Sequence, residues 1–119
     1  MTTETAWPTE VRLSKDKRTL TVSFDDGASF PIAAELLRVE SPSAEVQGHS
    51  AAQRKTVPGK RDVAILAVAP VGSYAVRLRF DDMHDTGIYT WTYLRELGER
   101  GAEKMAAYEA ALAEKGLSR

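Results

Sequence analysis

Residues 74–82 read YAVRLRFDD, a run in which apolar and charged side chains alternate. Successive residues of an extended chain point to opposite faces, so the apolar residues of this run share one face and its two arginines share the other. The apolar face holds Val76, Leu78 and Phe80, and the polar face holds Arg77 and Arg79. The pattern predicts a half-buried strand that ends at two aspartates and pairs with the strand before it.

The strand before it is predicted over residues 63–71, which are apolar at every position. A strand without a polar face is typical of one that is covered on both sides, so we expect it at the centre of the sheet. Pro70 has no backbone N–H, and we expect regular pairing to end there.

The first third of the chain predicts more strands and a helix. Apolar and polar residues alternate in 11–13 and in 20–24, on either side of a polar turn, and this pattern predicts a hairpin. A short strand is expected at 28–30, after the tight turn at 25–27. We expect a helix to begin at Pro31, because a proline in the first helical turn loses no hydrogen bond.

Residues 40–60 lack periodicity and predict a long loop. A short helix is expected to start at the N-cap Thr90 and to end before Gly98, and the alanine-rich residues 102–115 predict a longer C-terminal helix. Together these elements predict an α+β fold, with a small, mostly antiparallel sheet, short helices and a C-terminal helix.

Composition places the chain among ordinary globular proteins. Its 119 residues, 43% of them hydrophobic, suffice for one core, and a net charge of -1 gives no overall attraction to nucleic acid or anionic lipid. The absence of cysteine excludes disulfides and thiol chemistry. No apolar run resembles a signal peptide or a membrane span, so we expect a cytoplasmic protein without membrane or nucleic-acid partners.

Motifs for nucleotide chemistry are absent from the sequence. Gly59-Lys60 suggests a phosphate-binding loop, but Arg54 stands where that motif needs glycine and Arg61 stands where it needs a hydroxyl residue. No paired acid and base or activated nucleophile is visible either. We therefore expect no enzyme and no cofactor.

Two groups of residues are candidates for a site. Asp81, Asp82 and Asp85 surround His84, which suits metal binding or acid–base chemistry, although aspartates in turns commonly accept hydrogen bonds from the backbone instead. His49 is a weaker candidate, with only Glu45 nearby.

The aromatic residues Tyr89, Trp91 and Tyr93 follow closely. They suit a protein-binding surface that also includes Asp81, Asp82 and His84, or else they belong to the core. Arg77 and Arg79, joined by Arg12, are candidates for binding an anion or an acidic protein surface; the alternative is a solvated sheet face.

Several short runs resemble the gamma-butyrobetaine hydroxylase-like N-terminal domain family. The most specific are residues 74–82, HDTGIYTW at 84–91 and YLR at 93–95, supported by LR at 37–38, SPSAEV at 41–46 and PGK at 58–60. The similarity covers residues 11–98, so we expect a family domain there and a helical extension over residues 99–119. The resemblance implies a domain that occurs alone in bacteria with unknown function, or joined to 2-oxoglutarate-dependent hydroxylases or to ATPases that handle iron–sulfur clusters.

The resemblance also implies a metal site that this chain has lost. In the hydroxylases the similar domain holds structural zinc through three cysteines and one histidine, whose positions match Ser41, Ser43, Val46 and His84. Serine is a poor zinc ligand and valine has no donor atom, so we expect no metal. Hydroxylase activity belongs to a separate catalytic domain and is not expected here.

These observations favour a non-enzymatic accessory or protein-interaction domain, associated with iron–sulfur or oxygenase proteins. The alternative is a small-ligand or anion-binding module that uses Arg77, Arg79 and His84. We expect a protein partner of unknown identity, and a monomer or weak oligomer.

Overall fold

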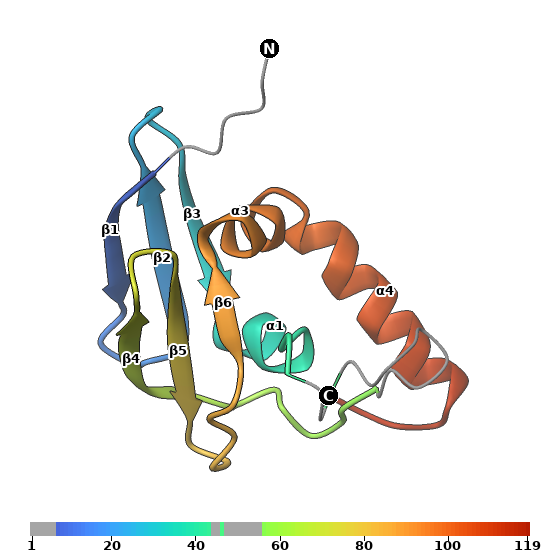
Figure 1. Cartoon of the computed structure of the whole chain (residues 1–119). Coiled ribbons are helices and arrows are strands. Elements are labelled where there is room, and N and C mark those ends of the chain that lie inside the picture. Colours follow the sequence, from blue (N-terminus) through green and yellow to red (C-terminus); the bar gives the residue numbers. More distant parts are fainter. Residues whose placement is uncertain (1–6, 44–45, 47–55) are drawn as a thin grey trace.

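The computed structural model describes residues 7–43, 46 and 56–119 (Figure 1). Its strands lie on one side of the molecule and its helices on the other. The first sheet consists of β1 (Pro8–Leu13), β2 (Thr19–Phe24) and β3 (Ser29–Ala33), and the second of β4 (Ile65–Val71), β5 (Ala75–Phe80) and β6 (Ile88–Thr90). All neighbouring strands are antiparallel, which confirms the predicted α+β class, although the strands form two sheets of three.

The first sheet has β2 at its centre, and the predicted hairpin of β1 and β2 is confirmed. The prediction that a helix begins at Pro31 is wrong. Pro31 lies in β3, opposite Thr21, and the strand continues to Ala33 before helix α1 begins. Proline is tolerated there because β3 is an edge strand, where a missing N–H need not interrupt the ladder.

The second sheet has β5 at its centre, as the alternation in residues 74–82 predicts for a strand with one buried face. The prediction of a central strand over residues 63–71 is wrong, because β4 is an edge strand and Leu66 is 44% exposed. Its exposed residues are Leu66, Ala67 and Pro70, so an uninterrupted apolar sequence here does not mean that both faces are covered. Pro70 does not end the pairing either, since it lies opposite Val76.

The helices of the described residues are α1 (Ala34–Val39), α3 (Trp91–Glu99) and α4 (Gly101–Glu114). Thr90 caps α3 as predicted, because its side chain accepts a hydrogen bond from the Tyr93 amide at 3.1 Å. Gly98 lies inside α3 and not beyond its end. A Cβ atom at this position would stand 2.5 Å from Cγ of Phe30, so glycine allows α3 to pack closely on β3.

One hydrophobic core joins both sheets to α1 and α3. A smaller cluster of Val39, Tyr108 and Leu112 attaches α4. The C-terminal segment adds a polar contact, since the Arg119 guanidinium binds both carboxylate oxygens of the buried Glu35, at 2.7 and 3.0 Å. No helix of the described residues is long and apolar enough to cross a membrane.

Removal of residues 102–119 should leave a folded but weaker domain, because both sheets and α3 pack without α4. Loss of Tyr108 and Leu112, and of the charge that faces Glu35, should lower the free energy of unfolding by roughly 2–4 kcal/mol. Chemical denaturation followed by circular dichroism measures this change. The same truncation with Glu35→Gln should recover part of the loss, and an unfolded truncated chain would show that α4 is essential to the fold.

Candidate functional site

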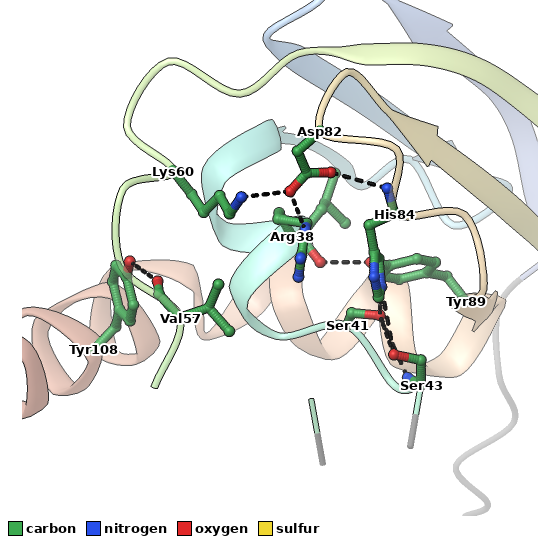
Figure 2. A network of polar contacts seen from close by, with 10 residues as sticks. Arg38, Ser41, Ser43, Val57, Lys60, Asp82, His84, Tyr89 and Tyr108 are labelled. Atoms are coloured by element: carbon green, nitrogen blue, oxygen red, sulfur yellow. Dashed lines mark hydrogen bonds and ion pairs between the residues drawn. The ribbon is translucent and has the colours of Figure 1, made fainter. Parts of the chain in front are cut away.

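The turn after β5 meets the segment after α1 in a buried polar cluster of Ser41, Ser43 and His84 (Figure 2). His84 Nε2 lies 2.9 Å from Ser41 Oγ and 3.4 Å from Ser43 Oγ. The two hydroxyl oxygens are 3.2 Å apart, and the Ser43 amide donates to Ser41 Oγ. The cluster therefore joins by hydrogen bonds two segments that are far apart in the sequence.

Two neighbouring residues fix the position of this cluster. Gly87 passes so close that a Cβ atom there would stand 2.5 Å from Ser41 Oγ, which favours glycine at this position. The Tyr89 hydroxyl donates to the Leu37 carbonyl at 2.5 Å. Burial raises the pKa of Tyr89 far above its ordinary value, so the phenol keeps its proton and remains a donor.

Asp82 forms the charged half of the same network (Figure 2). Its carboxylate accepts from Arg38 Nε at 2.7 Å and from Lys60 Nζ at 2.7 Å, and its second oxygen accepts from the His84 amide at 3.0 Å. Burial alone would raise its pKa, but the hydrogen bonds from Lys60, His84 and Arg38 outweigh this effect and lower the pKa to about 2. Asp82 is thus ionised at neutral pH.

The residues of the predicted interaction surface occupy different environments. Tyr89 is fully buried, and Trp91 and Tyr93 are half-buried and pack against the core. Both also donate hydrogen bonds to backbone carbonyls, Trp91 to Ser73 and Tyr93 to Glu40. Because the three rings pack inward, the surface that they offer to a partner is small. Asp81 is exposed.

His84 is only 8% exposed and lies in the cluster with Ser41, while Asp85 is exposed on the same turn. The structure therefore does not bring Asp81, Asp82 and Asp85 together around the imidazole as a ligand set, and no group of three metal-ligating side chains occurs in the described part of the chain. His49 and Glu45 lie outside the described residues.

Arg77 and Arg79 both lie on the exposed side of β5. The residues opposite them in the neighbouring strands are Ala69 and Ile88 for Arg77, and Ala67 for Arg79. We refer to these five residues as the arginine face. Arg12 does not belong to it, because it lies on β1 in the other sheet, where it pairs with Glu10.

The two arginines of this face differ from several other cations of the described residues in forming no ion pair there. Among residues 7–43, 46 and 56–119, no carboxylate forms an ion pair with Arg77 or Arg79. Two other arginines contrast with them, since Arg95 binds Asp26 and Arg18 binds Asp62. The arginine face is therefore cationic, and the residues beside the guanidinium groups are apolar.

The Ser41 and His84 pair resembles the nucleophile and base of a hydrolase, but both side chains are buried. Ser41 has no exposed surface. A cleft of about 330 Å³ near Lys60 and Asp82 and an apolar groove of about 250 Å³ between α3 and α4 both exclude Ser41 and His84 from their walls. The first cleft also balances Lys60, Arg61 and Arg119 against three aspartates, so its charge selects no ligand.

Sequence reasoning missed Arg38 and Lys60 as partners of Asp82. Arg38 lies 44 positions away in the chain, and no local pattern connects it to the turn. The runs LR at 37–38 and PGK at 58–60, which carry part of the family resemblance, were the available signal. Both runs supply a cation to the same carboxylate.

The geometry defines a small α+β domain with a buried polar cluster between the turn after β5 and the segment after α1. The family model described as gamma-butyrobetaine hydroxylase-like, N-terminal, matches residues 11–95. The chain belongs to this family. No curated protein matches it.

Solved structures agree with this assignment. Two NMR solution structures are each 44% identical with a TM-score of 0.84; they cover 98% and 100% of this chain and 91% and 90% of their own. A crystal structure of a protein with unknown function from Acidithiobacillus ferrooxidans, of the DUF971 family, is 42% identical with a TM-score of 0.63 and covers 76% of this chain and 91% of its own.

The family resemblance implies structural zinc, and the residues present do not fit it. Three of the four matched positions converge, since Ser41, Ser43 and His84 bond to one another, and the Val46 amide donates to the Ser43 carbonyl. Val46 is buried and offers no side-chain donor, and serine hydroxyls keep their protons near neutral pH. In this chain hydrogen bonds link Ser41, Ser43 and His84, at positions where a zinc-binding domain would have metal ligands.

Replacement of Asp82 by asparagine should destabilise the protein in a pH-dependent way. A pKa lowered from 3.8 to about 2 corresponds to about 2.5 kcal/mol, which solvent screening reduces, so we expect a loss of about 1–2 kcal/mol at pH 7. Because the pKa is lower in the folded protein than in the unfolded chain, the ionised carboxylate contributes its full stabilisation above about pH 4. This stabilisation is lost as the pH falls towards 2.

Urea denaturation of the wild type and of Asp82→Asn across this pH range measures the difference. Asp85→Asn is the matched control, since Asp85 is exposed on the same turn, and it should change stability by less than about 0.5 kcal/mol. A difference for Asp82→Asn that persists unchanged at pH 2 would contradict the role of its ionised carboxylate.

The purified wild type should contain no stoichiometric zinc, and chelators should leave its melting temperature unchanged. The combined variant Ser41→Cys, Ser43→Cys and Val46→Cys should bind about one zinc ion per chain, because it completes a Cys₃His set with His84. Elemental analysis after growth in zinc-supplemented medium measures both proteins. Near-equimolar zinc in the wild type would contradict the prediction.

Proposed function

We propose that this chain is a non-enzymatic accessory domain that acts by binding another protein, of the kind that carries iron–sulfur clusters or an oxygenase activity. The observation that carries the proposal is the arginine face. Arg77 and Arg79 are exposed without an internal ion pair among the described residues, and Ala67, Ala69 and Ile88 beside them give an apolar surface for contact. Arginine is enriched at protein interfaces, where its guanidinium can bind a carboxylate through two hydrogen bonds.

The absence of enzymatic activity is part of this proposal. The Ser41 and His84 pair, the arrangement closest to a catalytic dyad among the described residues, has no access to solvent through Ser41. The polar groups of this cluster are also bonded to one another, as expected for a structural network. Asp82 is occupied by two cations and a backbone amide.

A small-anion-binding module is less well supported. His84 would have to join Arg77 and Arg79, but its imidazole binds Ser41 and Ser43 in the interior. The arginine face also lies outside the walls of both clefts described above. Small ligands favour concave sites that surround them, whereas an open sheet face suits a larger partner. We propose a cytoplasmic monomer or weak oligomer that contacts neither nucleic acid nor membrane.

Charge reversal of the arginine face tests the proposal. The double variant Arg77→Glu and Arg79→Glu should fold like the wild type, because both side chains are exposed, yet it should lose the protein partner that the wild type captures from extracts of its own cells. Quantitative mass spectrometry of the captured proteins measures this loss. Lys15→Glu with Arg61→Glu is the matched control, with the same change of net charge at two other exposed positions.

Capture of the same proteins in equal amounts by the wild type and by the Arg77→Glu and Arg79→Glu variant would overturn the proposal. Equal loss in the double variant and in the control variant would also overturn it, because net charge rather than the arginine face would then decide binding.

A further inference from the structure

Building on the proposed function, we infer that the arginine face binds an extended acidic segment of the partner, in which every second residue is Asp or Glu. The inference rests on the spacing of two guanidinium groups and on the small side chains beside them. The partner class follows from charge complementarity on an exposed sheet face.

The spacing comes from the strand itself. Arg77 and Arg79 are two residues apart in β5, so both side chains leave the same face with their Cα atoms about 6.8 Å apart. In an extended partner segment, carboxylates two residues apart repeat at the same distance and also point to one side. One such segment can place a carboxylate against each guanidinium at once, and each pair can be bidentate.

The surroundings favour close approach along the strand. Ala69 and Ile88 lie on either side of Arg77, and Ala67 lies beside Arg79. Alanine side chains leave room for the partner backbone, and Ile88, which is 42% exposed, offers aliphatic contact to the methylene groups of the acidic side chains. Partial removal of water from the ion pairs by such contacts strengthens them relative to pairs in open solvent.

The positive charges of Arg77 and Arg79 are not neutralised by carboxylates of the described residues. Three other cations are instead bound to carboxylates, since Arg38 and Lys60 share Asp82 and Arg119 binds Glu35. Arg77 and Arg79 lack such partners within residues 7–43, 46 and 56–119. An incoming acidic segment therefore has no internal carboxylate to displace.

Two fluorescein-labelled peptides of identical composition test the inference by anisotropy at low ionic strength. The sequence Thr-Thr-Glu-Thr-Glu-Thr-Glu-Thr-Thr places its carboxylates on one face of an extended chain, whereas Thr-Glu-Thr-Thr-Glu-Thr-Thr-Glu-Thr places neighbouring carboxylates on opposite faces. The first peptide should bind about fivefold more tightly, as expected for one additional charge-assisted contact.

Arg77→Gln and Arg79→Gln should each remove this preference. Arg61→Gln, at an exposed position outside the arginine face, should retain it. Equal binding of both peptides, no binding of either, or tighter arginine-dependent binding of a single-stranded oligonucleotide would overturn the inference. These outcomes leave the proposed function standing if charge reversal still removes the captured protein partner. Capture that survives charge reversal defeats the proposed function itself, whatever the peptides do.

Discussion

The carboxylate of Asp82 is the interaction on which the arrangement of the polar segments depends. It holds the end of α1 through Arg38, the loop before β4 through Lys60, and its own turn through the His84 amide. These three segments have little regular structure with which to bind one another. A single ionised side chain therefore sets the relative positions of the segments that also carry Ser41 and His84, at a cost in desolvation that its three hydrogen bonds offset.

The hydrogen-bonded cluster next to Asp82 shows how a domain of this family is organised without thiolates. Ser41, Ser43 and His84 converge at the positions that the resemblance assigns to zinc ligands, and Val46 adds an apolar side chain to the interior. Such hydrogen bonds are individually weaker than metal coordination, so the surrounding close contacts matter more. Gly87 and the Tyr89 hydroxyl supply such contacts at the rim of the cluster.

Local patterns predicted those elements whose two faces differ in polarity. The alternation in β2 and β5 identified their buried residues, and Thr90 identified the start of α3, because these signals lie within a few adjacent positions. The predicted central position of residues 63–71 was wrong because a uniformly apolar sequence does not distinguish a covered strand from an edge strand. The role of Gly98 depends on Phe30 in another strand, and the bond between Arg38 and Asp82 spans 44 positions.

The candidate site divided in the same way. The aromatic residues after His84 turned inward, as large apolar rings do when a core is near, whereas the two arginines of β5 stayed on the face that alternation assigns to solvent. Alternation thus located the charged face, but nothing in the sequence showed that its charges lack internal partners. That property depends on where every carboxylate of the fold lies.

Three tyrosine hydroxyls reach backbone carbonyls on one stretch of chain: Tyr89 donates to Leu37, Tyr93 to Glu40 and Tyr108 to Val57. Each of these bonds recognises the main chain and ignores the side chain of the acceptor. Any amino acid supplies the same carbonyl, so with respect to these bonds the acceptor positions are free to vary during evolution. Substitution of the tyrosines by phenylalanine would instead remove these donors, which places the selective pressure on β6, α3 and α4.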